Sequence, residues 1–172
     1  DSRQSRGLGD VYKRQRVQQI LELPYQRAKR ALAPHRAKLE GKRVHFLPDS
    51  QLEIPMARFL SEECGLEVSE IGTPFHDQLV MQGELARLAK DVSIVEGQDL
   101  DPALARVRES RPDLTVCGMG IANALESEGL RTKWSIELVF SPVQGFDQAG
   151  DLAALFAKPL VRQDILEVGS WS

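Results

Sequence analysis

The residues that decide the fold are 113–120, which read DLTVCGMG: a short apolar run that ends in glycines. The run is too short for a helix and contains β-branched residues, so it predicts a buried strand. Gly118 and Gly120 allow the tight turn that leads from such a strand into a helix. A second run, RVHFL at residues 43–47, is followed by Pro48 and Asp49 and predicts a second buried strand.

Outward from these two runs, strand-like and helix-like segments alternate along the chain. We expect strands at residues 43–47, 66–71, 92–95, 113–117 and 134–140, and helices at 25–42, between Ser50 and Gly65, at 77–89, after Asp101, at 122–128 and after Asp147. This alternation predicts an α/β fold, a Rossmann-like, doubly wound parallel sheet of about five strands flanked by helices.

The expected domain occupies residues 42–160. A helix at 16–41 precedes it and belongs to a preceding domain, with Pro34 kinking or interrupting it, and a tail at 161–172 follows. Residues 1–15 read DSRQSRGLGDVYKRQ, lack the apolar segment of a signal peptide, and resemble translated adapter sequence. We therefore interpret them as a non-native leader.

Composition excludes several classes of protein. The 172 residues contain no apolar run near the roughly 20 residues needed to cross a bilayer, so no membrane span is expected. Two cysteines and three histidines are too few for a Cys/His metal site or a disulfide framework. Residues 1–43 hold 12 of the 22 basic and 4 of the 25 acidic residues, but a solvated helix and the leader explain this excess without nucleic acid.

Most candidate chemical residues have a structural explanation. Gly118 and Gly120 lack the third glycine of a dinucleotide-binding fingerprint, because position 123 is Asn. Ser50 and Glu53 have capping-box spacing, and Cys64 and Cys117 are expected to be packing residues. The roles of Asp49, His76 and Glu137 stay open, and no catalytic residue is assigned.

Two aromatic residues are the exception. Trp134 and Phe140 fall on one face of the expected strand at 134–140. Such a pair can belong to the core, or it can form the wall of a flat apolar pocket for a planar aromatic ligand. The residue pattern alone leaves both interpretations open.

Four stretches carry a resemblance to a known family: PDSQLEIP at 48–55, EGQD at 96–99, RPDLTVCGMGIAN at 111–123 and ESEGLRTKWSIELVF at 126–140. They resemble the nitrogenase component 1 family, and within it the N subunits of light-independent (dark-operative) protochlorophyllide reductases. The resemblance covers residues 27–160. It implies a C-terminal fragment of such a subunit.

The resemblance also implies cofactors and partners. In that family two N–B pairs form a heterotetramer, and a 4Fe–4S cluster lies between the N and B subunits. A separate dimeric L protein binds ATP-Mg, carries its own 4Fe–4S cluster and delivers electrons, which reduce the ring D double bond of protochlorophyllide to give chlorophyllide a. The three cluster cysteines of the N subunit lie in its N-terminal part, so neither cofactor ligands nor metal ligands are expected in this chain.

Trp134 and Phe140 match aromatic residues that line the pigment pocket of that family, so we expect them to bind substrate. The alternative is a scaffold or interaction domain in which both rings are buried and do not contact substrate. A third possibility, a small-ligand-binding domain of periplasmic or response-regulator type, lacks the expected signal peptide or phosphoacceptor cluster. Residue usage and the lack of a transit peptide favour a bacterial cytoplasm over a plastid.

Overall fold

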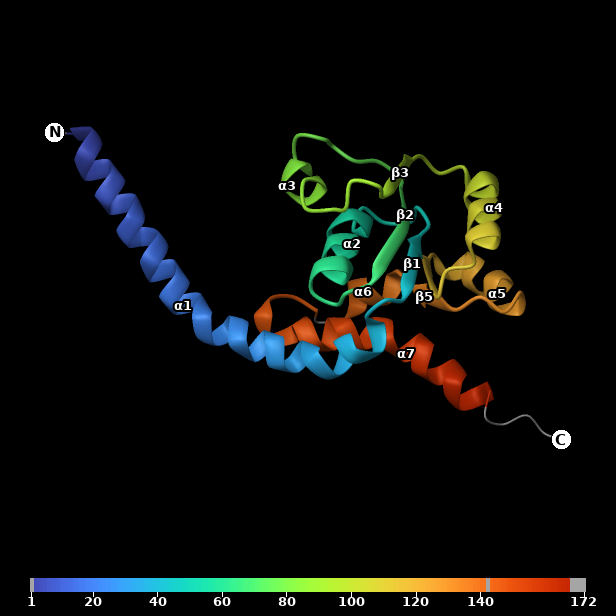
Figure 1. The fold of residues 1–172 in the computed structure, drawn as a ribbon. Helices are drawn as coiled ribbons and strands as arrows, with labels where there is room; N and C mark the ends of the chain where they lie inside the picture. Colours follow the sequence, from blue (N-terminus) through green and yellow to red (C-terminus); the bar gives the residue numbers. More distant parts are fainter. Residues whose placement is uncertain (1, 142, 168–172) are drawn as a thin grey trace.

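The computed structural model describes residues 2–141 and 143–167, with side chains described for 11–141 and 143–162. Its described part contains a five-stranded sheet in the order β3-β2-β1-β4-β5, and every neighbouring pair is parallel. The strands are β1 (Arg43–Phe46), β2 (Glu67–Thr73), β3 (Ser93–Glu96), β4 (Leu114–Cys117) and β5 (Thr132–Trp134). The predicted α/β class with a parallel sheet is confirmed (Figure 1).

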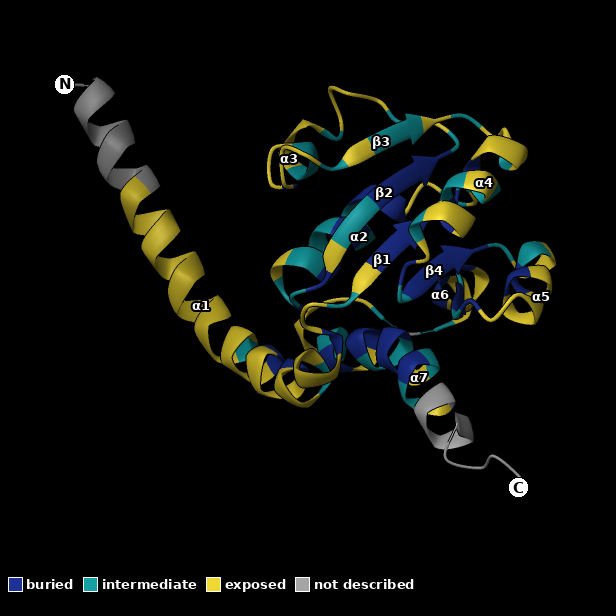
Figure 2. Cartoon of the chain, turned by 45° about the vertical axis from the view of Figure 1, so that its right-hand side comes forward, coloured by how far each residue is buried: buried dark blue, intermediate teal, exposed yellow. Residues whose placement is uncertain are grey.

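Helices cover both faces of this sheet. They are α1 (Ser2–Leu39), α2 (Glu53–Glu62), α3 (Gln82–Leu85), α4 (Leu100–Ser110), α5 (Met119–Ser127), α6 (Ile136–Phe140) and α7 (Ala149–Glu167), with a 3-10 turn η1 (Phe146–Gln148). Helices α1, α2 and α7 contribute to one core, and α4 and α5 contribute to the other. Residues 11–23 of α1 extend away from the sheet and are exposed (Figures 1 and 2). None of the described helices is long and apolar enough to cross a membrane.

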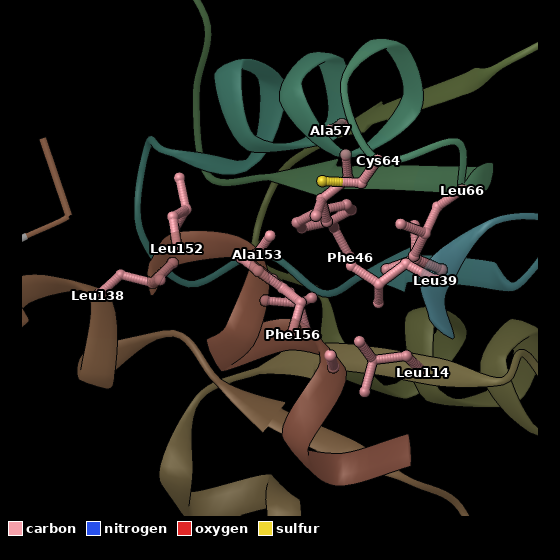
Figure 3. Packing of buried hydrophobic residues seen from close by; sticks show 14 of the residues in the cluster. Leu39, Phe46, Ala57, Cys64, Leu66, Leu114, Leu138, Leu152, Ala153 and Phe156 are labelled. Carbon is pink, nitrogen blue, oxygen red and sulfur yellow. The ribbon is translucent and has the colours of Figure 1, made fainter. Parts of the chain in front are cut away.

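The larger core joins the sheet to α1, α2 and α7. Phe46 of β1 and Phe156 of α7 are fully buried and lie among aliphatic side chains that include Leu39 and Leu114 (Figure 3). Helices α1 and α7 approach closely, since a Cβ added to Gly150 would lie 2.8 Å from Cβ of Ala31. Close helix contact thus depends on glycine at this position.

The opposite face of the sheet has a smaller core. Val107 of α4 and Leu125 of α5 pack with Leu47, which follows β1, and with Cys117, which ends β4. All four side chains are nearly inaccessible to solvent. The central strands are therefore covered on both sides, which agrees with their nearly continuous apolar sequence.

The strand predicted at residues 134–140 is wrong. Strand β5 ends at Trp134, Ser135 turns the chain, and residues Ile136–Phe140 form α6. The apolar residues of this short run satisfy a helical spacing as well as a strand alternation, and periodicity cannot separate the two over so few residues. Trp134 and Phe140 therefore do not share one face of a strand.

Other boundaries also differ. The helix predicted at 77–89 is reduced to α3, because the Asp77 carboxylate accepts hydrogen bonds from the backbone N–H groups of Leu79 and Val80, at 2.8 and 3.1 Å, and holds a turn there. Asp147 lies in η1 rather than capping α7, and it pairs with Arg27 at 3.2 Å.

The terminal segments are helical across the predicted boundaries. Helix α1 runs from Ser2 to Leu39 through Pro24 and Pro34, so Pro34 does not interrupt it. Helix α7 continues beyond residue 160 to Glu167, while residues 168–172 of the predicted tail lie outside the described residues. The assignments of 1–15 as a leader, of 16–41 to a preceding domain and of 161–172 as a tail stay predictions.

Candidate functional site

The carboxyl edge of the sheet brings the ends of β1 and β4 together. The strand order changes direction between these two neighbours, and ligands of doubly wound folds bind at such a switch point. Asp49 follows β1, and Gly118 follows β4. A Cβ added to Gly118 would lie 2.6 Å from Oδ1 of Asp49, so a side chain at position 118 would displace the Asp49 carboxylate.

Ser135 connects three strand ends at this edge. Its hydroxyl donates to Oδ2 of Asp49, and its backbone N–H donates to the carbonyl oxygen of Cys117 at 3.0 Å. These bonds fix the turn between β5 and α6 against the loop after β1. The position of α6 thus depends on a polar contact between residues 86 positions apart in sequence, together with the buried side chain of Leu138.

Glu53 anchors the loop after β1. Its buried carboxylate accepts hydrogen bonds from the backbone N–H of Ser50 at 2.5 Å and of Asp49 at 3.2 Å, and from Oγ1 of Thr73 at 3.2 Å. The predicted Ser50–Glu53 pairing is therefore present. The helix itself is capped differently, because α2 has Leu52 as its N-cap residue and Oγ of Ser50 accepts from the Leu52 N–H at 3.1 Å.

Several apolar side chains on the loops and helices after the strands are exposed. Phe140 is 81% exposed and Val139 is 63% exposed, both on α6, and Met119 at the start of α5 is 58% exposed. Trp134 is partly exposed at the end of β5. A contiguous exposed apolar patch is typical of an interaction or ligand site, and Val139 and Phe140 are neighbours at the end of α6. Phe140 thus lies outside the core, whereas Trp134 is partly buried against the smaller core.

A groove of about 1090 Å³ lies beside β5, between this edge strand and α7. Trp134 lines it together with Leu130 and Leu155, and His35 and Lys38 of α1 close one side. Phe140 does not line this groove. The two rings predicted to share a wall therefore belong to different parts of the edge, Trp134 to the groove and Phe140 to the exposed surface of α6.

The two cysteines do not form a cofactor site. Cys64 and Cys117 are buried in separate cores, and burial raises the pKa of each thiol to about 12. Iron–sulfur clusters need thiolate ligands. Within the described residues, no group of three or more His, Cys, Asp or Glu side chains could hold a metal ion. The described residues therefore do not fit a 4Fe–4S cluster.

Two histidines face carboxylates away from the switch point. His45 is buried, with Nε2 at 3.5 Å from Oε1 of Glu70, and burial lowers its pKa against the opposing effect of Glu70. His76 Nδ1 lies 3.0 Å from Oε2 of Glu96 and joins the loop after β2 to β3. Both contacts connect neighbouring strands, which is a structural role.

Sequence reasoning missed Ser135 and Lys133, which flank Trp134. Lys133 is only 4% exposed although it is charged. Lys133 and Trp134 are consecutive residues of β5, so strand alternation places their side chains on opposite faces of the sheet. Nothing in the sequence around Ser135 indicates its distant partner Asp49.

Comparisons with known proteins give a consistent result. The family model for nitrogenase component 1 type oxidoreductases matches residues 2–160. The chain is similar to light-independent protochlorophyllide reductase subunit N of Halorhodospira halophila, with 59% identity over 154 residues, which cover 90% of this chain and 36% of that protein. The subunit N of Acidiphilium rubrum is 56% identical over 153 residues, which cover 89% of this chain and 36% of that protein. The chain thus spans about a third of the length of these curated relatives.

Solved structures show the same fold at low identity. The structure described as nitrogenase Cp1 at pH 6.5 matches with a TM-score of 0.68 and 15% identity, covering 86% of this chain and 34% of that one. The structure at pH 5 matches with a TM-score of 0.72 and 12% identity, covering 92% of this chain and 38% of that one. These two matches bear on the fold alone.

Proposed function

Because the chain belongs to the nitrogenase component 1 type oxidoreductase family, we propose that it forms part of a subunit that reduces protochlorophyllide in the absence of light. The relatives named as light-independent protochlorophyllide reductase subunit N support this choice of substrate, at 55–59% identity. In this proposal the chain supplies one wall of the pigment site, in a bacterial cytoplasmic complex of two N–B pairs. The other walls come from the rest of the N subunit and from the B subunit.

The observation that carries the proposal is the exposed apolar surface at the carboxyl edge of the sheet. Phe140 is 81% exposed at the end of α6, and Trp134 ends β5 just before that helix. A flat tetrapyrrole needs broad apolar contacts and exclusion of water. Aromatic side chains supply both with little loss of conformational entropy.

The polar contacts at this edge give the apolar residues a fixed position. Ser135 follows Trp134 directly and is bound to Asp49 and to the carbonyl oxygen of Cys117. The loop that holds Asp49 is in turn fixed by the buried carboxylate of Glu53. In the proposed function these residues position α6 and do not take part in chemistry.

Electrons reach the pigment from outside this chain. In this proposal a 4Fe–4S cluster would be held by other parts of the N–B complex and would supply electron-transfer chemistry, with an ATP-hydrolysing L protein as the source of electrons. Since the described residues do not fit such a cluster, no step of electron transfer is assigned to this chain. Its own contribution is to bind the pigment and to exclude water.

The test is pigment binding by a full-length subunit that carries this segment, assembled with its partner subunit. Replacing Phe140 by Ala, or Trp134 by Ala, removes ring contact and is expected to weaken protochlorophyllide binding about tenfold, which corresponds to ~1.4 kcal/mol. Leu79→Ala is the matched control, because Leu79 is equally exposed (86%) but lies on the loop between β2 and α3. Unchanged affinity in both ring variants would favour the scaffold interpretation instead.

A further inference from the structure

A row of buried polar side chains crosses the face of the sheet that α4 and α5 cover. Leu47 and Cys117 belong to the smaller core, so the residues two positions before them face the same helices. These residues are His45 of β1 and Thr115 of β4, which are cross-strand neighbours, and Glu70 of β2 lies on the other side of His45. All three are at most 7% exposed. A polar group in such a place is costly unless it is hydrogen-bonded or paired, so its partners matter for the stability of this face.

Glu70 is paired with a side chain of α4. Both oxygens of its carboxylate accept hydrogen bonds from Nε of Arg106, at 3.0 and 2.8 Å. The side chain of Glu70 is 9% exposed, whereas that of Arg106 is 37% exposed. Arg106 therefore connects the partly exposed side of α4 to a buried carboxylate of β2. Apolar contacts add little to this attachment, since Ala103 and Val107 are the buried residues of α4.

His45 faces the same carboxylate without a hydrogen bond to it. Its Nε2 atom lies 3.5 Å from Oε1 of Glu70 and, within the described residues, has no hydrogen-bond partner. Its Nδ1 atom lies 3.5 Å from Oγ of Ser69, whose hydroxyl donates to the carbonyl oxygen of Val44 at 3.0 Å. Burial lowers the pKa of His45, Glu70 raises it and Arg106 lowers it. His45 is therefore neutral at neutral pH, and Arg106 supplies the charge that balances Glu70.

The other elements around His45 contribute side chains that do not change charge with it. Thr115 has a buried hydroxyl that finds no hydrogen-bond partner in the described part of the chain. Cys117 lies two residues further along β4, and its thiol stays protonated because burial raises its pKa to about 12. Glu126 of α5 is exposed and accepts a hydrogen bond from Thr132, further across the sheet. The charged groups that act on the imidazole are thus the carboxylate of β2 and the guanidinium of α4.

Protonation of His45 places a second cation beside a carboxylate that already has one. Like charges repel strongly where water is excluded. The side chain of His45 is 2% exposed and lies within a strand, whereas that of Arg106 is 37% exposed and can turn into solvent. The imidazolium then pairs with Glu70 in place of the guanidinium. A state in which Arg106 has left binds the proton more readily, so a lower pH favours that state.

We propose that His45, Glu70 and Arg106 form a pH-sensitive clamp, which holds α4 on the sheet at neutral pH and releases it when His45 takes up a proton. In the released state Arg106 faces solvent and α4 opens locally while the rest of the sheet stays folded. The clamp is separate from the exposed surface of α6, and the proposal does not depend on the pigment.

The first experiment follows the clamp by NMR in the full chain from about pH 7 to about pH 4.5, the range in which a histidine with a lowered pKa titrates. We expect the ring resonances of His45 and the Nε–H resonance of Arg106 to change with the same midpoint. The amide protection factors of α4 should fall about tenfold relative to those of α7, because α4 opens locally.

Three results of this titration would overturn the proposal. The first is an Arg106 Nε–H resonance that stays unchanged while His45 is protonated. The second is a His45 ring that does not titrate in the folded chain. The third is an equal fall of protection in α4 and α7, which would mean that acid unfolds the whole domain rather than releasing one helix.

A variant pair assigns the effect to one histidine. His45→Gln keeps a polar side chain of similar size that takes up no proton, so the protection of α4 should stay constant over the same pH range. His35→Gln removes the partly exposed histidine of α1 and should keep the fall seen in the parent chain. Arg106→Gln removes the partner of Glu70 and should lower the protection of α4 already at neutral pH. If His45→Gln shows the same fall as the parent chain, another group controls α4 and the assignment is wrong.

Discussion

Two regions of the molecule differ in how far their apolar side chains are buried: the contact between α1 and α7, and the carboxyl edge of the sheet. At the first, Gly150 and Ala31 bring the helices close together and Phe156 is completely buried. At the second, Phe140 is 81% exposed, and its helix α6 is held by the buried Leu138 and by the polar turn at Ser135. The difference separates residues that the fold needs from residues that the fold only positions, and the candidate functional surface belongs to the second group.

The largest expected effect lies at the contact between α1 and α7. Gly150→Leu forces a side chain into space occupied by Ala31, both its Cβ and its backbone carbonyl, and is expected to cost about 3 kcal/mol of unfolding free energy. Urea denaturation followed by circular dichroism measures the change. Gly83→Leu is the control, because a Cβ at Gly83 meets nothing within 4 Å and stability should not fall. Equal loss in both variants would show that the helices are not closely packed.

An intermediate effect is expected at Lys133, which is buried like a core residue and charged like a surface residue. Its folded-state pKa of about 8 is below its usual value of 10.5, so the unfolded chain binds more protons between these two pH values. Taken alone, Lys133 makes the unfolding free energy rise with pH across this window, by up to about 3 kcal/mol. The penalty is fully present below pH 8 and disappears above 10.5. The two buried thiols, whose pKa is raised to about 12, act in the opposite direction above pH 9.

Lys133→Met tests this sign directly. The unfolding free energy of the parent minus that of the variant should rise between pH 8 and 10.5, because the two buried thiols are present in both chains and cancel. The variant should be more stable than the parent at pH 7, in urea titrations at each pH. Lys90→Met, at an exposed position, should keep the parent's pH dependence. A difference between parent and variant that stays constant over this window would mean that Lys133 does not titrate in it.

The smallest effect is expected at the exposed edge. Phe140→Ala should change the unfolding free energy by less than about 0.5 kcal/mol, because the ring makes little contact with the rest of the domain. Thermal unfolding measures this against the parent chain. A loss above about 2 kcal/mol would place Phe140 in the core and remove the contrast between the two regions.

Local sequence pattern was enough to predict the central part of this molecule. The buried strands at 43–47 and 113–117 and the parallel α/β class follow from apolar runs bounded by glycine and proline, and the structure confirms them. Residues 134–140 are ambiguous because their apolar spacing fits both a strand and a helix. At the turn between β5 and α6, Ser135 contacts Asp49, a distant residue that local pattern cannot reveal.

The candidate site can be predicted only in part from the sequence, because it too depends on contacts between residues that are distant in the chain. The sequence indicates Trp134 and Phe140 as candidate site residues. The prediction that they share one face of a strand is wrong, since the turn at Ser135 separates them. The sequence indicates a turn at Gly118, and the structure shows in addition that the Asp49 side chain approaches this glycine closely. The burial of Lys133 and its groove depend on α7 and α1, which come from opposite ends of the chain.

The central claim is that the exposed surface of α6 faces the pigment, and a fluorine probe tests it most directly. A full-length subunit that carries this segment and has 4-fluorophenylalanine at position 140 is assembled with its partner subunit and titrated with protochlorophyllide. The account predicts a large ring-current shift of the fluorine resonance at position 140 and none at position 146, where Phe146 lies against Tyr25. An unchanged resonance at position 140 when pigment is bound would contradict it.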